Sequence, residues 1–327
     1  MEYQHIVAEL EKAAATLLAP PNLVTSEQRS SAEAVFLEFR KTKDPFTLCK
    51  VILEHCHVDY VLFEASGLIK EGLIREWGRP GGQVSTANDV KELRAYLLSY
   101  VISRPTLSNY VRERIVQVMA IIIKRQSVED FGEDRRLVLS EVQQLIAGSN
   151  SSMQMQMVGC SILGAMLQEY ATTVKSSDVG LPWEVHFKAK KQFELTDLKS
   201  IFEFCLQALR QLAPTLTTVP IPAEKHNLIL RLTTLAEAVL SWTFINVNLP
   251  KKLISVFESD QNPSLRPGAT WKETIFDPTI PQLFFDLHMR VRHDSELSHH
   301  TINCLVQLSS LNGTVMTKKE NRLEYYT

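Results

Sequence analysis

Glycine is scarce in this chain, with 12 glycines among 327 residues. Phosphate-binding loops and tight β-turns depend on glycine, because its backbone adopts conformations that other residues avoid. The sequence also contains no P-loop, dinucleotide-binding, nucleophile-elbow or zinc-protease motif. These absences argue against an α/β nucleotide-binding enzyme and against an all-β fold. We therefore expect a protein that is not an enzyme.

The chain also has no large excess of positive or negative charge, since 35 basic and 37 acidic residues give a net charge of −2. A surface for nucleic acid or for an anionic membrane needs a basic field, which this balance does not supply. No stretch reaches the ~20 apolar residues of a membrane-spanning helix. The first residues lack the basic leader and apolar run of a secretory signal. We expect no nucleic acid and no membrane as partners, and a location in the cytosol, the nucleus or both.

Paired metal ligands are missing too. The five cysteines are scattered, which indicates small buried residues of a reducing compartment. The candidate ligand clusters are Cys49, Cys56 and His57, and His293, His299 and His300. A zinc site needs three or four convergent ligands, normally in two closely spaced pairs, and neither cluster has a second pair. We predict no metal and no cofactor.

What the sequence does contain is a long series of amphipathic helical patterns. Apolar residues recur every three or four positions between short polar or proline-containing breaks, which predicts helices with one buried face. The predicted helices span residues 3–18, 26–42, 45–53, 60–77, 90–103, 108–125, 135–147, 153–174, 195–212, 223–244, 250–258, 278–291 and 295–311, with another beginning at 318. Their spacing predicts an all-α fold, an α-solenoid of about six antiparallel HEAT-type pairs.

Some local features carry their own predictions. We expect Thr25 or Ser26 to cap one helix, and Asp44 to cap the next helix with Pro45 in its first turn. Lys175–Glu194 shows no helical stripe and is predicted as a surface connection, and Ser259–Thr274 as a loop. The basic run Lys188, Lys190 and Lys191 is expected to be solvated. Trp77 and Trp242 are predicted in the core, while Trp183 and Trp271 are candidates for partner contacts.

One helix has a second stripe opposite its core stripe. In residues 60–77 this stripe contains Tyr60, Phe63, Gly67, Lys70 and Ile74. Apolar side chains around a positive charge form a plausible protein-binding patch. The alternative is that Phe63 packs against a neighbouring repeat.

Two segments resemble the amino-terminal repeats of the importin-β superfamily of nuclear transport receptors. The first, residues 32–77, is AEAVFLEFRKTKDPFTLCKVILEHCHVDYVLFEASGLIKEGLIREW. The second, residues 110–125, is YVRERIVQVMAIIIKR. Further strings, among them VLSWTF and LFFDLHMRVRHDSE, resemble the exportins of this superfamily. The resemblance covers nearly the whole chain and becomes poor after Met316, so we expect the chain to be truncated at its C-terminal end.

The resemblance implies binding of the GTPase Ran in its GTP form by the inner helices of the first repeats. On this chain these helices are Glu27–Lys41, Tyr60–Trp77 and Tyr110–Arg125, with Arg112 and Arg114 expected to be exposed. The candidate Ran-binding residues are Arg29, Glu33, Tyr60, Phe63, Lys70, Ile74, Arg112 and Arg114. We predict residues 1–125 as the Ran-binding repeats and residues 126–327 as further exportin repeats.

For the whole protein, the resemblance implies that protein cargo leaves the nucleus in contact with nuclear pore proteins. The implied cargo includes the hypusine-modified translation initiation factor, with transcription factors as a second class. The receptor would shuttle between nucleus and cytoplasm. Three alternatives stay open: a helical scaffold without Ran binding, a receptor from a neighbouring exportin branch that shares the LSW-type helix, and a helical enzyme with an unmarked site.

Overall fold

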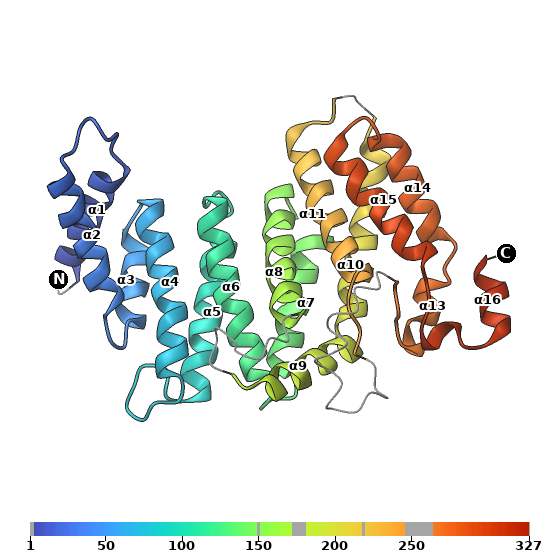
Figure 1. Ribbon diagram of the computed structural model, residues 1–327, viewed down its shortest axis with the longest axis horizontal. Coiled ribbons are helices and arrows are strands. Elements are labelled where there is room, and N and C mark those ends of the chain that lie inside the picture. The colour runs from blue at the N-terminus through green and yellow to red at the C-terminus, as the bar shows by residue number, and fades with distance from the viewer. Residues whose placement is uncertain (1–2, 149–150, 172–180, 218–219, 246–263, 327) are drawn as a thin grey trace. The chain divides into compact units, whose positions relative to one another are not determined.

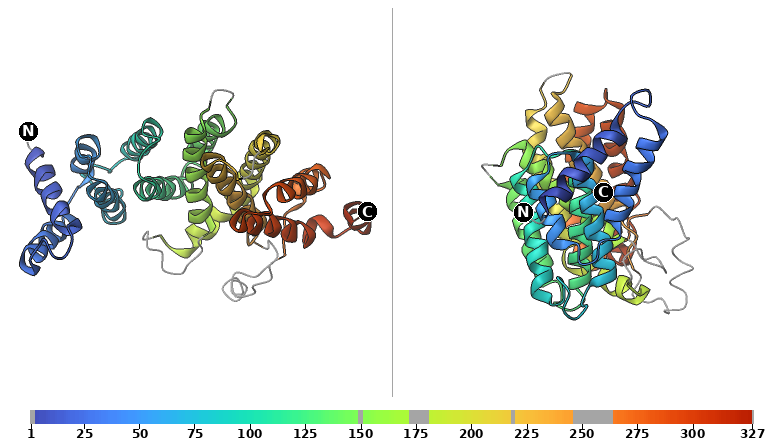
Figure 2. Two further views of the ribbon diagram at one scale, coloured as in Figure 1. Left: turned by 90° about the horizontal axis from the view of Figure 1, so that it is seen from above. Right: turned by 90° about the vertical axis from the view of Figure 1, so that its left-hand side faces the viewer.

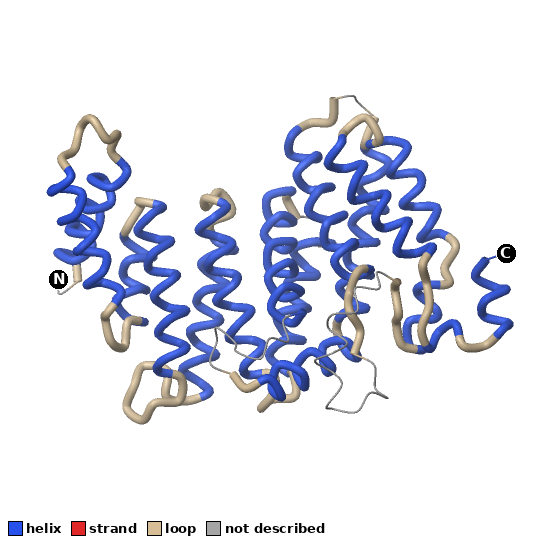
Figure 3. Tube along the Cα trace, in the orientation of Figure 1, coloured by secondary structure: helices blue, strands red, loops and turns tan. Residues whose placement is uncertain are grey.

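The computed structural model describes residues 3–148, 151–171, 181–217, 220–245 and 264–326. Within these ranges the regular structure is helical throughout, as Figure 3 shows, which confirms the all-α prediction. One compact unit contains the helices before residue 132, and a second contains the helices that follow.

The first unit consists of three helix pairs (Figure 1). Its helices are α1 (Gln4–Leu18), α2 (Ser26–Arg40), α3 (Phe46–His55), α4 (Asp59–Glu76), α5 (Ala87–Ser103) and α6 (Asn109–Gln126). Within the pairs α1 packs on α2, α3 on α4 and α5 on α6, and α4 also packs on α6. In the left view of Figure 2, which looks at the structure from above, helices α3 to α6 appear nearly end-on as two successive pairs. This stacking of second helices is the HEAT-type arrangement that the spacing predicts.

The start of α2 confirms one predicted cap. The Thr25 hydroxyl accepts a hydrogen bond from the Gln28 amide at 3.2 Å, and the Gln28 side chain accepts one from the Thr25 amide at 2.9 Å. This reciprocal capping box satisfies two of the amide donors that a helix start leaves without partners.

The predicted cap at Asp44 is wrong. The cap position of α3 is Pro45, with no side-chain capping bond, and Asp44 has a positive φ of 45°. The Asp44 amide donates to Glu76 at 2.8 Å, and its carboxylate accepts from the Gln83 amide at 3.2 Å. Contacts with the end of α4 and the loop after it therefore hold Asp44 away from the helix start. Gly72 allows the close approach of α3 to α4, because a Cβ there would lie 2.8 Å from the Pro45 ring.

In its described residues, the second unit contains three more pairs and three additional helices. Its helices are α7 (Glu133–Ala147), α8 (Met153–Ala171), α9 (Trp183–Thr196), α10 (Leu198–Leu212), α11 (Ala223–Leu240), α13 (Lys272–Ile275), α14 (Thr279–Val291), α15 (Ser295–Ser309) and α16 (Lys319–Tyr326). The pairs are α7 with α8, α10 with α11 and α14 with α15, and α11 lies between α8 and α15. Within the described ranges the two units together have six pairs, as predicted. The helix predicted at 250–258 lies outside the described residues.

The prediction of a surface connection over Lys175–Glu194 is wrong from Trp183 onward, where α9 begins. Residues 175–180 and the side chain of Trp183 lie outside the described part of the chain. The buried positions of α9 recur at helical spacing and are His186, Ala189, Lys190, Phe193 and Glu194. Three of these five side chains are polar, so hydropathy shows no stripe.

Polar contacts hold α9 in place. Lys190, predicted to be solvated, is 6% exposed, and its ammonium lies 5.2 Å from the centre of the Trp242 ring. Glu194 accepts a hydrogen bond from the Trp242 indole at 2.9 Å. At the α9–α10 turn, Asp197 pairs with Arg135 of α7 at 2.6 Å, with both side chains buried. The buried face of α9 is therefore held by a cation–π contact and a hydrogen bond as well as by apolar packing, and the turn after it is held by an ion pair.

Both tryptophans of this unit with described side chains are in the core. Trp242 is 6% exposed, as predicted, whereas Trp271 is only 2% exposed, so its assignment as a partner-contact residue is wrong. The Trp271 ring packs against Phe202 and Phe244, with ring centres 6.3 and 5.7 Å apart. The predicted loop Ser259–Thr274 includes a short 3-10 turn and the start of α13, which direct this ring inward.

Candidate functional site

Helix α4 carries the candidate surface of the first unit, because it lies beside both α2 and α6. Its core stripe is fully buried, including Val61, Leu68 and Leu73. The residues of the second stripe are each partly exposed: Tyr60, Phe63, Gly67, Lys70 and Ile74. We call this stripe, with the side chains of α2 and α6 that border it, the α4 surface. Its accessibility is what a partner-binding surface requires.

On the α2 side, the α4 surface is bordered by one aromatic contact and one ion pair. The rings of Phe36 and Tyr60 meet edge to face, with centres 5.1 Å apart. Arg40 donates two hydrogen bonds to Glu64, at 2.9 and 2.8 Å, in a bidentate pair. Burial and then the nearby Glu64 carboxylate raise the pKa of Tyr60, so its phenol stays neutral. The charges along this seam are matched within the molecule.

On the α6 side, Phe63 is covered in part by two residues of the next pair. Its ring centre lies 5.7 Å from that of Tyr110, and the Arg114 guanidinium lies 4.7 Å above the ring. The alternative that Phe63 packs against a neighbouring repeat is thus confirmed. Phe63 nevertheless remains partly exposed, and Tyr110 is 50% exposed.

The expectation that Arg112 is exposed is wrong. Arg112 is 4% exposed and donates to the carbonyl of Pro105 at 3.2 Å and to the side chain of Asn109. Residues two apart on a helix point about 200° apart, so Arg112 faces inward while Arg114 reaches the α4 surface. Only the second of these two arginines is accessible to a partner.

The two candidates on α2 lie on the helical face that leads to Phe36 and Arg40. Glu33 is exposed. Arg29 is partly buried and donates to the Ala19 carbonyl at 3.2 Å, which ties the start of the α1–α2 loop to α2. The structure therefore brings Glu33, Tyr60, Phe63 and Arg114 onto adjoining helices, with Lys70 and Ile74 further along α4. Arg29 has a visible structural role.

Sequence reasoning missed Tyr110 as a member of this surface. The sequence feature that could have identified it is its spacing of four residues from Arg114, which places both side chains on one face of α6.

Trp77, predicted in the core, is only partly buried, and the Arg125 guanidinium lies 4.5 Å from its ring centre.

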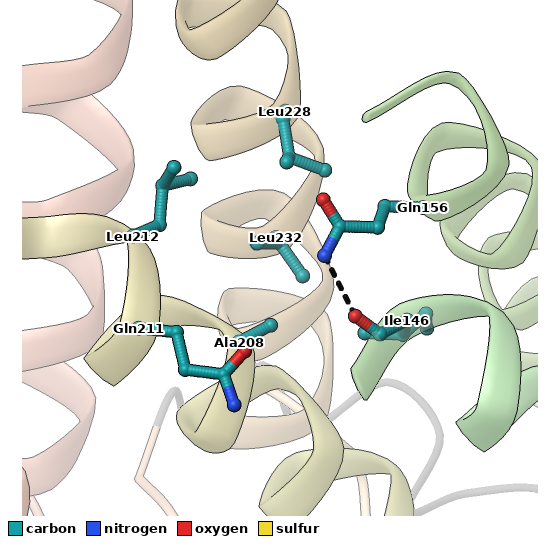
Figure 4. Close-up of a pocket in the computed structure, with 7 residues that line it drawn as sticks. All are labelled: Ile146, Gln156, Ala208, Gln211, Leu212, Leu228 and Leu232. Carbon is teal, nitrogen blue, oxygen red and sulfur yellow. Dashed lines mark hydrogen bonds between the residues drawn. The ribbon is translucent and has the colours of Figure 1, made fainter. Parts of the chain in front are cut away.

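The second unit has a cavity of about 190 Å³ between the ends of α7 and α10 and the starts of α8 and α11 (Figure 4). It is lined by Ile146, Gln156, Ala208, Gln211, Leu212, Leu228 and Leu232. In Figure 4 the Gln156 amide donates to the Ile146 carbonyl, at 2.8 Å. No lining residue titrates, so the cavity offers no group for acid–base catalysis.

The candidate metal clusters do not assemble. Among the described residues, no group of three or more histidine, cysteine or carboxylate side chains is placed to hold a metal ion. Cys49 and Cys56 are fully buried, and burial raises the pKa of both thiols, that of Cys56 to about 12. Metal ligation by cysteine requires the thiolate, which this burial disfavours.

The family of the chain follows from comparison with known proteins. Within the exportins, the sequence strings most resemble the exportin-4 family, and exportin-7-like receptors are the alternative because they share the LSW-type helix. A family model described as Exportin-4 matches residues 1–327. The chain belongs to the exportin-4 family. Its HEAT-type helix pairs are thus those of an exportin.

Individual relatives of this exportin-4 family chain are distant. Exportin-4 of Dictyostelium discoideum is 22% identical over 320 residues, covering 92% of the chain and 28% of the relative. Exportin-7-A of Xenopus laevis is 24% identical over 293 residues, covering 89% and 25%. Ran-binding protein 17 of Homo sapiens is 24% identical over 317 residues, covering 96% and 27%. The chain spans about a quarter of the length of these relatives.

In the described part of the chain, no helix combines the length and apolar character needed to cross a bilayer.

Proposed function

We propose that this exportin-4 family chain supplies the Ran-GTP-binding repeats of a nuclear export receptor. Residues 1–125 would bind Ran, and residues 126–327 would continue the solenoid toward the cargo. The observation that carries the proposal is the α4 surface, where partly exposed aromatic side chains and two basic side chains from successive repeats lie together. Aromatic and arginine side chains dominate binding energy at protein interfaces. The name of one relative, Ran-binding protein 17, supports the same partner.

The transport activity would belong to the whole receptor. We propose protein cargo that includes the hypusine-modified translation initiation factor, with transcription factors as a second class. Contacts with nuclear pore proteins would carry the complex between nucleus and cytoplasm. Ran-GTP and cargo would favour the same curvature of the solenoid, so each strengthens binding of the other, and GTP hydrolysis would release both.

A carrier fits the described residues better than an enzyme. The α4 surface is an open strip on three helices, whereas catalysis relies on a concave site with convergent titratable groups. The contacts of Phe36 with Tyr60 and of Arg40 with Glu64 tie α2 to α4 along the border of this strip.

The test is a calorimetric titration of this chain with Ran bound to a non-hydrolysable GTP analogue, and with Ran-GDP in parallel. Binding selective for the GTP form, weakened by Lys70→Glu and by Arg114→Glu, is the expected result. Lys91→Glu, on the exposed side of α5, makes the same charge change away from the α4 surface and should bind as the wild type does.

Equal binding of both nucleotide forms, or no binding even when cargo is added, would favour the scaffold alternative. That alternative also expects Lys70→Glu to leave every interaction unchanged.

A further inference from the structure

The α4 surface contains two basic side chains that the described residues leave without a carboxylate. Arg114 is partly buried, its Nε has no hydrogen-bond acceptor, and its Nη1 has only a long contact of 3.4 Å to Gln117. Lys70 makes no ion pair or hydrogen bond within the described ranges. A buried donor without an acceptor costs stability, and the cost is greater when the group is charged.

Two other basic side chains on the helices that form this surface have acceptors. Arg40 has its bidentate contact with Glu64, and Arg125 donates to the Leu73 carbonyl at 3.2 Å. The unmatched positive charge of Arg114 and Lys70 lies along one seam, between the middle turns of α4 and the first turns of α6. It does not reflect a general lack of acidic residues in this unit.

The Arg114 guanidinium is also held in one orientation. It stacks over Phe63, with 4.7 Å between the guanidinium carbon and the ring centre, which restricts its rotation. Gly67 lies one turn further along α4, and a Cβ there would be 3.8 Å from Nη2 of Arg114. Because glycine has no side chain, the edge of the guanidinium beside it stays open. A planar guanidinium group that is already held in one orientation loses little conformational entropy when it binds a carboxylate.

We propose that Arg114, assisted by Lys70, is the carboxylate-binding subsite of the α4 surface. Its ligand is an aspartate or glutamate side chain of the partner protein, and an adjacent apolar side chain of that partner covers Tyr110. The partner's carboxylate supplies the acceptors that Arg114 lacks, in a bidentate pair of the kind that Arg40 and Glu64 already form. The partner's identity as Ran rests on the proposed function, whereas the chemistry of the subsite does not.

The first experiment needs no Ran. In a sample labelled with ¹⁵N-arginine, the Nε–H resonance of Arg114 is assigned by its loss in Arg114→Lys. The probe is a hexapeptide of alternating Glu and Leu, and its control is the same peptide with Gln in place of Glu. We expect a saturable shift of the Arg114 signal with the acidic peptide only, and no such shift for exposed Arg79. Absence of a saturable shift at Arg114 would overturn the proposal.

The second experiment uses Ran-GTP. Arg114→Gln should raise the dissociation constant about 10-fold or more, and Lys70→Gln by a smaller factor, because charge-assisted pairs are the stronger hydrogen bonds. Both effects should shrink at high salt. The matched control, Lys91→Gln, should leave binding unchanged.

The two experiments separate the subsite from the proposed function. If Ran-GTP binds and Arg114→Gln has no effect, the subsite is wrong while the proposed function stands. If Ran binds in neither form while the acidic peptide shifts Arg114, the subsite stands and the partner is another acidic protein.

Discussion

Removing one member of the buried ion pair in the second unit should destabilise that unit strongly. Arg135 is 0% and Asp197 4% exposed at the side chain. Arg135 donates a hydrogen bond to Asp197 at 2.8 Å through Nε, and its Nη2 lies 2.6 Å from the same carboxylate oxygen. Asp197→Asn keeps the shape of the side chain but leaves a buried guanidinium without a counter-charge. Asp197 makes no capping hydrogen bond at the start of α10, so the variant does not also remove a helix cap.

The expected loss of unfolding free energy is about 3 kcal/mol, the lower end for breaking a buried pair, because the amide oxygen still accepts one bond. For a unit of this size, the loss corresponds to a fall in melting temperature of roughly 6–12 °C. Scanning calorimetry and urea unfolding would measure both quantities. The double variant Arg135→Met with Asp197→Leu should recover most of the loss, since it leaves no buried charge.

A surface pair in the same unit is the control. Arg210 and Asp277 are 3.2 Å apart, but their side chains are 44% and 36% exposed. Asp277→Asn should therefore cost at most about 1 kcal/mol. Equal, small effects of Asp197→Asn and Asp277→Asn would refute the argument that burial makes the first pair critical.

Three further predictions concern other parts of the chain. Burial raises the pKa of Glu194, so the folded state holds this proton more tightly than the unfolded state does. Stability should therefore fall as pH rises from about 4.3 through the raised pKa, and Glu194→Gln should flatten that part of a urea-unfolding series. Thr25→Ala should lower the unfolding free energy of the first unit by about 1 kcal/mol through loss of the capping box, measured the same way. An aromatic disulfide reagent should modify no cysteine of the native protein and all five after denaturation, because each is buried; rapid native labelling would contradict this packing. The five are Cys49, Cys56, Cys160, Cys205 and Cys304.

The helix pairs could be predicted from sequence because apolar spacing reports one buried face directly. The same method failed at α9, since three of its five buried side chains are polar. Arg135 and Asp197 are 62 positions apart in the sequence, and the local sequence around each residue does not indicate that the two will form a buried ion pair. The prediction that Trp271 contacts a partner was wrong for a related reason, because the residues that surround its ring are distant in sequence.

The candidate site was predictable to a similar degree. Helical spacing on α4 identified Tyr60, Phe63 and Lys70, because that stripe lies opposite a clear core stripe. The same spacing could not decide between Arg112 and Arg114, since α6 is apolar around much of its circumference and buries charged side chains as well. The spacing of Tyr110 from Arg114 places both on one face of α6, but its contact with Phe63 depends on the packing of α4 against α6.

The polar face of α9 has a consequence for how the second unit finds its arrangement. Leucine and isoleucine stripes on successive helices are similar enough that one pair could slide past the next with little change in contact. A charged or hydrogen-bonding side chain in the core tolerates no such slip, because a displaced Asp197 or Glu194 would be buried without its donor. We infer that α9 fixes the register of helix packing in the second unit, because its polar contacts make one alignment of the helices far more favourable than alignments shifted along the helix axes.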